Sequence, residues 1–168
     1  MTRNDTAARI IAVCGKICCG KSFYTDKLKN ELNAVVLSCD ELTHVLFDND
    51  LGDGHDAMML RVKRYFHKKA AEIVRSGCNV ILEWGFWSHA DRAEVTALYR
   101  EQGIEIEWHY IDISDEDWQK NIAARNAAVR AGDNSVFELD EGLMKKLLSL
   151  FEPPTHDEID VWYINRRA

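Results

Sequence analysis

The chain has 168 residues, 46% of them hydrophobic, which is enough for one well-packed domain and too few for two of ordinary size. Its formal net charge of -7 at pH 7 and its pI near 5.4 exclude a general electrostatic attraction to nucleic acid or to an anionic membrane surface. The mean hydropathy is -0.31, and no apolar run has the length of a membrane span or a signal peptide. We therefore expect a soluble, cytoplasmic protein with no membrane partner.

Three short apolar runs in the first half of the chain predict buried strands over 9–14, 34–38 and 78–82. Helices are expected between them over 23–32, over a short stretch ending near 47, and over about 57–76, where Gly77 follows as a stop signal. The acidic segment 48–56 is predicted to be a loop. It does not fit a calcium-binding EF-hand, because Met59 stands where that pattern needs a glutamate.

In the second half, two serines followed three residues later by an aspartate predict helix starts at Ser88 and Ser114. The first of these helices should end near Gly103 and the second should run toward Arg130. Strands are predicted over 105–111 and 161–164, with a last helix ending before the proline pair at 153–154. Strands that alternate with helices predict a three-layer α/β/α domain over residues 1–168, with a mainly parallel five-stranded sheet.

The most informative stretch is residues 15–22, Gly-Lys-Ile-Cys-Cys-Gly-Lys-Ser, which fills every fixed position of the phosphate-binding pattern GxxxxGK(S/T). The glycines let the backbone turn tightly, so that its N–H groups and the next helix can hold a pyrophosphate. Lys21 is expected to reach the outer phosphates, and the Ser22 hydroxyl to bind Mg²⁺. The alternative, a glycine-rich turn that contains Lys-Ser by chance, does not require the strand before it and the helix after it. The pattern predicts a P-loop NTPase fold with nucleotide-binding residues Gly15, Lys16, Ile17, Cys18, Cys19, Gly20, Lys21, Ser22 and Phe23.

Ligands collect beyond the carboxyl ends of parallel strands, and two carboxylates are predicted to lie there. Asp40 follows the second strand and is our candidate for the base that takes the proton of an acceptor hydroxyl. It could equally cap the helix that follows it, and the two roles are compatible. Glu83 follows the third strand, where it would hold Mg²⁺ with Ser22 or form a structural ion pair.

Two further groups of residues have both a functional and a structural interpretation. Trp84 and Trp87 would form an apolar wall for an organic acceptor, with Arg92 as a polar contact, or would simply pack over the end of the sheet. Arg125 and Arg130 precede a break in the helical pattern at 131–135. They would neutralise a phosphoryl group as catalytic residues on a short helical lid at about 125–138, or form a solvated basic helix end.

Together, several segments resemble the small zeta-toxin-like P-loop kinases, which are similar to polynucleotide kinases, chloramphenicol phosphotransferases and zeta toxins. The resemblance rests on 15–22, Ser38-Cys39-Asp40, the stretch 80–88 with Arg92, Ala124-Arg125-Asn126 and Phe151-Glu152-Pro153-Pro154. It implies ATP and Mg²⁺ as cofactors, Asp40 as base, Arg125 and Arg130 as lid arginines, and Asn126 with 152–155 near the adenine.

One position departs from the polynucleotide kinases, which have an arginine three residues after the equivalent of Asp40, whereas this chain has Thr43. With the acidic net charge, this disfavours nucleic acid as a partner. The leading hypothesis is a kinase that phosphorylates a hydroxyl of a small molecule such as a metabolite, a sugar-like compound or an antibiotic. A polynucleotide or nucleotide-sugar kinase, and a nucleotide switch with slow hydrolysis, are the alternatives. The sequence gives no indication of an oligomeric state.

Overall fold

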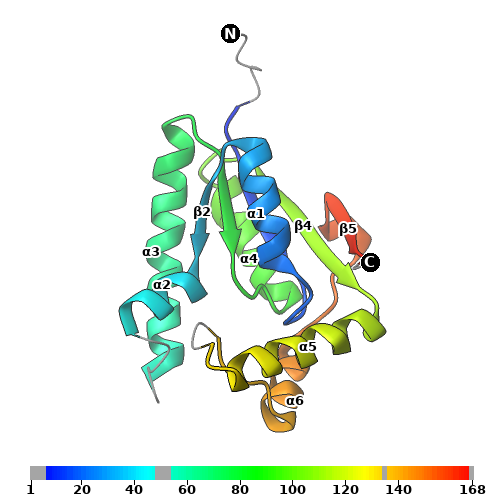
Figure 1. The fold of residues 1–168 in the computed structure, drawn as a ribbon. Coiled ribbons are helices and arrows are strands. Elements are labelled where there is room, and N and C mark those ends of the chain that lie inside the picture. The colour runs from blue at the N-terminus through cyan, green and yellow to red at the C-terminus, as the bar shows by residue number, and fades with distance from the viewer. Residues whose placement is uncertain (1–6, 48–53, 134–135, 167–168) are drawn as a thin grey trace.

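A computed structural model of the chain describes residues 7–47, 54–133 and 136–166. Their strands form one sheet in the order β2-β3-β1-β4-β5, and every pairing between these strands is parallel (Figure 1). The strands are β1 (Ile10–Cys14), β2 (Val35–Ser38), β3 (Val80–Glu83), β4 (Ile106–Ile113) and β5 (Val161–Asn165). The predicted α/β fold with a five-stranded parallel sheet is therefore confirmed.

Helices lie on both faces of this sheet and beyond its carboxyl edge (Figure 1). In chain order they are α1 (Lys21–Leu32), α2 (Cys39–Phe47), α3 (His55–Arg75), α4 (His89–Arg100), α5 (Asp115–Arg130) and α6 (Glu141–Leu150), with a short 3-10 turn η2 (His156–Glu158). Helix α1 covers one face, α3 and α4 cover the other, and α5 and α6 lie beyond the strand ends. The site expected at the carboxyl edge is thus bordered by helices.

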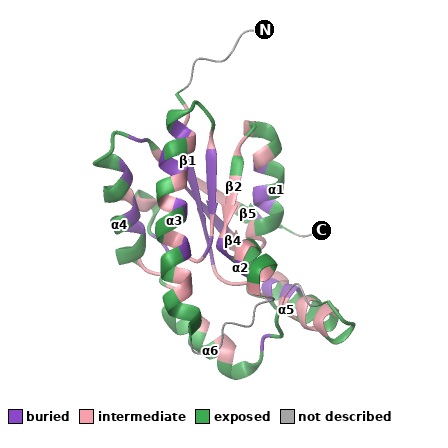
Figure 2. Ribbon diagram, turned by 90° about the vertical axis from the view of Figure 1, so that its left-hand side faces the viewer, coloured by how far each residue is buried: buried purple, intermediate pink, exposed green. Residues whose placement is uncertain are grey.

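Strand β1 shows why the sheet forms from these residues. All five of its residues are fully buried, as the purple central strand in Figure 2 shows. Alternate side chains point to opposite faces, so Ile10 and Ala12 pack with α3 and α4, whereas Ile11 and Val13 pack with α1. A strand buried on both faces must be apolar throughout, which is the pattern that the sequence shows.

The predicted helix starts agree with the structure at two capped positions. The Ser88 hydroxyl accepts a hydrogen bond from the Asp91 N–H, and the Asp91 carboxylate accepts one from the Ser88 N–H. Ser114 caps α5 in the same way through the Asp117 N–H. The predicted loop at 48–56 lies mainly outside the described residues, and α3 has already begun at its end. Among the helices described, none is long and apolar enough to cross a membrane.

Candidate functional site

The loop between β1 and α1 takes a conformation that depends on two glycines. Gly15 and Gly20 have φ angles of +151° and +98°, which side chains rarely allow. A Cβ atom on Gly15 would lie 2.6 Å from the Cys19 sulfur and 2.8 Å from the Ile111 carbonyl oxygen, and one on Gly20 would lie 2.4 Å from the Asn165 amide nitrogen. The fixed glycines of the motif are therefore required by local packing as well as by backbone geometry.

Three side chains from distant parts of the chain hold this loop by its carbonyl groups. The bonds run from Trp118 Nε1 to Ile17 O (2.6 Å), from Asn121 Nδ2 to Cys18 O (2.9 Å) and from Asn165 Nδ2 to Cys19 O (2.8 Å). In a trans peptide unit the C=O and the following N–H point in opposite directions. Fixing the carbonyls on α5 and β5 thus turns N–H groups of the loop toward the other side, where an anion can be bound. These three residues were not predicted, because nothing in their local sequence marks them.

Lys21 and Lys16 differ in their surroundings. The Lys21 ammonium donates hydrogen bonds to the carbonyl oxygens of Gly15 (3.0 Å) and Lys16 (3.1 Å), so it lies over the loop itself. The Lys16 ammonium instead forms an ion pair with Asp115 (3.0 Å) and lies 4.2 Å from the centre of the Trp118 ring. The Lys21 ammonium thus lies within the loop, whereas the side chain of Lys16 joins the loop to α5.

Glu83 lies beside the motif serine, as its position at the end of β3 predicted. In the sheet it is opposite Val13 of β1 and Ser38 of β2. Burial raises the pKa of Glu83, while a hydrogen bond with the Ser22 side chain and the positive charge of Lys21 act against that rise. A hydroxyl and a carboxylate in contact next to a phosphate cradle are the hard oxygen donors that Mg²⁺ prefers, so these residues fit that ion.

Asp40 is exposed in the first turn of α2, and its negative charge also raises the pKa of Glu83. The alternative role for Asp40 as the helix cap is corrected by the structure. The Ser38 hydroxyl accepts the hydrogen bond from the Glu41 N–H (3.3 Å), and the helix begins at Cys39. Asp40 is therefore not needed to begin α2, and its carboxylate stands at the same edge as Glu83.

Two of the predicted acceptor contacts lie inside the protein. Trp84 is only 3% exposed and stacks with Phe66 at a ring distance of 6.3 Å, so it belongs to the core. Arg92 is 2% exposed, and its guanidinium donates to the Phe86 carbonyl oxygen (3.1 Å) and to the Glu158 carboxylate (3.1 Å). Arg92 therefore joins α4 to the turn η2 rather than facing an acceptor.

The segment that the resemblance places near the adenine contacts the start of α4. The Glu152 N–H donates to the Trp87 carbonyl oxygen (2.7 Å), and the Glu152 carboxylate accepts a hydrogen bond from the His89 N–H (2.7 Å). Trp87 is half-buried, with its ring edge-on to Phe151. These contacts give Glu152 a structural role at the N-terminus of α4, and the nearness of residues 152–155 to the adenine stays a prediction.

The predicted lid residues lie together on α5 and bind the segment that follows it. Arg125 Nε donates to the Phe137 carbonyl oxygen (3.0 Å), and Arg130 Nε to the Glu138 carboxylate (2.8 Å). The Asn126 amide both donates to and accepts from the backbone of Leu139, at 3.0 and 2.9 Å. Asn126 thus holds the chain between α5 and α6. Residues 134–135 of the predicted lid lie outside the described residues.

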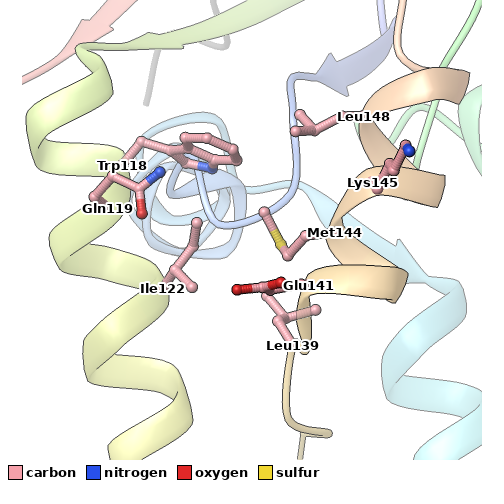
Figure 3. A pocket seen from close by; sticks show the side chains of 8 residues that line it. All are labelled: Trp118, Gln119, Ile122, Leu139, Glu141, Met144, Lys145 and Leu148. Carbon is pink, nitrogen blue, oxygen red and sulfur yellow. The ribbon is translucent and has the colours of Figure 1, made fainter.

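A cavity of about 480 Å³ separates α5 from α6 (Figure 3). Its lining residues are Trp118, Gln119, Ile122, Leu139, Glu141, Met144, Lys145 and Leu148. The described residues of α6 include no buried side chain, so this helix packs loosely against its neighbours. None of the lining residues belongs to the phosphate loop, and the cavity is therefore a space between the two helices rather than part of the cradle.

Several solved structures resemble this one. A candidate kinase from Chloroflexus aurantiacus has a TM-score of 0.71 and 19% identity, with 95% of this chain and 88% of that chain covered. The APS kinase CysC of Mycobacterium tuberculosis, in complex with AMPPNP and APS, has a TM-score of 0.67 and 19% identity, with 96% and 91% covered. The Pnkp1/Rnl/Hen1 RNA repair complex has a TM-score of 0.66 and 16% identity, with 89% of this chain and 46% of that chain covered.

These similarities show that the chain has the fold of P-loop kinases, while identities below one fifth say nothing of its acceptor. No curated protein matched its sequence. The model of the AAA domain family AAA_33 matches residues 10–154, which is most of the sequence, and the chain therefore belongs to that family.

Proposed function

We propose that the protein is an ATP- and Mg²⁺-dependent kinase that transfers the γ-phosphate to a hydroxyl of a small molecule. The observation that carries this proposal is the electrostatic cluster of Lys21, Glu83 and Asp40 at the carboxyl edge of the sheet. Glu83 is paired in the sheet with Ser38, two residues before Asp40, and the charges of Lys21 and Asp40 both act on its pKa, so the three groups lie at one edge of the sheet. A cradle for phosphate next to an exposed carboxylate is what phosphoryl transfer to a hydroxyl requires.

In this proposal each group has one role. The loop N–H groups and Lys21 hold the phosphates, and Ser22 with Glu83 holds Mg²⁺, which neutralises charge on the phosphates when it is bound. Asp40 orients the acceptor hydroxyl and takes its proton. Arg125 and Arg130 exchange their present contacts with residues 137–138 for the transferring phosphoryl group. Trp87, at the same strand ends, borders the acceptor.

The structure shows what Thr43, the residue that argues against a polynucleotide acceptor, contacts. Thr43 is buried in α2, and its hydroxyl donates to the Cys39 carbonyl oxygen (3.0 Å). This residue stands where the polynucleotide kinases have a phosphate-binding arginine, so the side chain offers nothing to a nucleic-acid phosphate. We therefore favour a small acceptor over RNA or DNA, and we keep the narrower likeness to zeta-toxin-like kinases as part of the proposal.

The test is transfer of labelled γ-phosphate from ATP to a panel of hydroxyl compounds that includes sugars, antibiotics, nucleosides and RNA ends. Asp40→Asn should lower the rate of transfer at least about 100-fold, because a general base contributes on that order, while ATP binding is retained. Glu41→Gln is the matched control, since it removes an exposed carboxylate from the same helical turn. Full activity of Asp40→Asn would remove Asp40 from this role. Slow hydrolysis of ATP with no transfer to any acceptor would favour a nucleotide switch.

A further inference from the structure

Lys63 on α3 has an unusual environment for a lysine. It is half-buried, yet no hydrogen bond or ion pair reaches its ammonium group within the described residues. Every other buried or half-buried lysine or arginine in that part of the chain has such a partner. The ammonium group is not among the buried unpaired atoms of those residues, so it reaches solvent at the end of a half-buried stem and is open to an anionic ligand.

The location of Lys63 is set by the packing of α2 against α3. Cys39, the residue before Asp40, packs in one cluster with Val62 and Phe66 of α3. Burial raises the pKa of the Cys39 thiol to about 12, and the positive charge of Lys63 acts against that rise. The Lys63 ammonium therefore lies near the first turn of α2. Helix α2 itself lies at the strand ends, where the acceptor is expected (Figure 1).

His67 follows Lys63 by four residues, so the two side chains lie on the same face of α3, one turn apart. Burial, with a smaller contribution from the charge of Lys63, lowers the pKa of His67 to about 4, and the imidazole is neutral at pH 7. Its Nδ1 lies 2.7 Å from the hydroxyl of Tyr99, which is fully buried and, within 7–47, 54–133 and 136–166, has no other partner to which it can donate.

This contact fixes the tautomer of the imidazole. We assign Tyr99 as the donor to Nδ1, because its buried hydroxyl has no other acceptor among the described residues, and this assignment puts the ring proton of His67 on Nε2. Within the described residues, no hydrogen-bond acceptor faces this Nε2–H. The ring of Trp84 packs edge-on to His67 at 5.3 Å and supplies an apolar boundary. Lys63 and His67 thus present two donors without protein acceptors on one helix face.

We propose that Lys63 and His67 bind an oxyanion of the acceptor, so that the substrate carries a phosphate or carboxylate group as well as the hydroxyl that is phosphorylated. This inference rests on the proposed function, because it places the anion on the acceptor side of Asp40. A charged and a neutral donor on one helix face suit a tetrahedral or planar oxyanion. The positive charge also offsets the repulsion that Asp40 and Glu83 exert on an anionic acceptor.

The experiment compares matched pairs of compounds on protein saturated with AMPPNP and Mg²⁺, so that the phosphate loop is filled. The pairs are glycerol 3-phosphate with glycerol, ribose 5-phosphate with ribose, and gluconate with glucose, and binding is measured by calorimetry. The anionic member of at least one pair should bind more tightly than its neutral partner. Lys63→Gln should weaken that binding at least about tenfold, which is the loss expected for one charge-assisted hydrogen bond.

Arg64→Gln is the control, because it removes the same charge from an exposed neighbouring position on α3. His67→Gln is the second variant. It should also weaken the binding of the anionic member and leave the binding of the neutral member unchanged. Equal binding of both members of every pair, or of wild type and Lys63→Gln, would overturn the anion site.

Transfer of γ-phosphate from ATP to the same compounds separates the two proposals. Lys63-dependent binding without transfer would support the anion site and contradict the kinase. Transfer to neutral and anionic members alike would support the kinase and contradict the anion site.

Discussion

The side-chain amide of Asn165 donates a 2.8 Å hydrogen bond to the carbonyl oxygen of Cys19, which lies 146 positions away in the sequence. Both residues are buried, so the last strand of the sheet fixes the shape of the phosphate loop. The same amide also occupies the space next to Gly20 where any side chain would collide with it. The cradle is therefore completed by the final strand, and its properties should respond to substitutions there.

Asn165→Leu is expected to reduce the free energy of unfolding by about 1–3 kcal/mol, because the Cys19 carbonyl would stay buried without its donor. The affinity for ATP should fall with it. Urea denaturation and an ATP titration measure the two effects. Asn30→Leu is the control, since the Asn30 amide is exposed and donates only within α1. Wild-type ATP affinity in Asn165→Leu would show that the loop keeps its shape without this bond.

Lys21→Ala should abolish the rise in melting temperature that ATP and Mg²⁺ give to the wild-type protein. A ligand that binds only the folded state must stabilise it, and Lys21 is the ammonium group over the loop. Lys27→Ala, which removes an exposed lysine from the same helix, should retain the rise. The melting temperatures are read by a thermal-shift titration. An equal rise in Lys21→Ala would mean that this lysine does not contact the phosphates.

Arg92→Met should destabilise the protein by about 1–3 kcal/mol, because the Phe86 carbonyl oxygen would lose its buried donor and Glu158 would lose its guanidinium partner. The Arg92 side chain is 2% exposed, and that of Glu158 is 22% exposed. Chemical denaturation gives the change in stability. Arg100→Met, at an exposed position near the end of α4, should reduce the free energy of unfolding far less. If the two variants were equally stable, the contact between α4 and η2 would contribute little.

Stability should also decrease in acid through Glu158. Burial alone would raise the pKa of Glu158, but hydrogen bonds from Arg92, the Thr155 backbone and His89 outweigh it and lower the pKa from 4.5 to about 2. A carboxyl with a lowered pKa in the folded state stabilises the protein above its unfolded pKa, and that contribution is lost as pH falls from 4.5 toward 2. Denaturation curves at several pH values should show this loss, and Glu158→Gln should flatten it.

A second pH dependence is expected from His67. Its pKa is lowered from 6.5 to about 4, so the folded state takes up its proton less readily than the unfolded state. The contribution of His67 to stability is therefore complete above pH 6.5 and decreases as pH falls toward 4. His67→Gln should remove this part of the profile, while His55→Gln, at an exposed position, should not. Identical profiles for wild type and His67→Gln would contradict the buried neutral imidazole.

Much of the fold could be predicted from local patterns, because each depends on residues close together in the chain. The expected helix from about 57 to 76 is α3 (His55–Arg75), and the serine caps at Ser88 and Ser114 start α4 and α5 as predicted. The strand ends also brought Ser22 and Glu83 together as expected. A periodicity of apolar residues fixes which face is buried, and parallel strands bring their carboxyl ends to one edge.

The site residues were harder to predict where their role depends on a distant partner. Arg92 comes shortly after the predicted helix cap at Ser88, close to the end of the third strand. This location is why we predicted a contact between Arg92 and the acceptor. Only packing shows that Glu158, 66 positions later, lies against it. The hydrogen bonds of Asn126 with the backbone of Leu139 likewise join residues that no local pattern connects, while its contact with the nucleotide stays a prediction.

The sequence by itself determined the phosphate-loop motif, the alternation of strands and helices, and the carboxylates at the strand ends. Each of these features depends on residue types and spacings within one short segment of the chain. The tertiary structure decided what each polar side chain binds. It gave the loop its anchors on α5 and β5, enclosed Arg92 and left Lys63 without a partner among the residues that the structure describes. Such choices depend on which segments packing brings together, and the free energy of burying a polar group depends on the partner that it finds there.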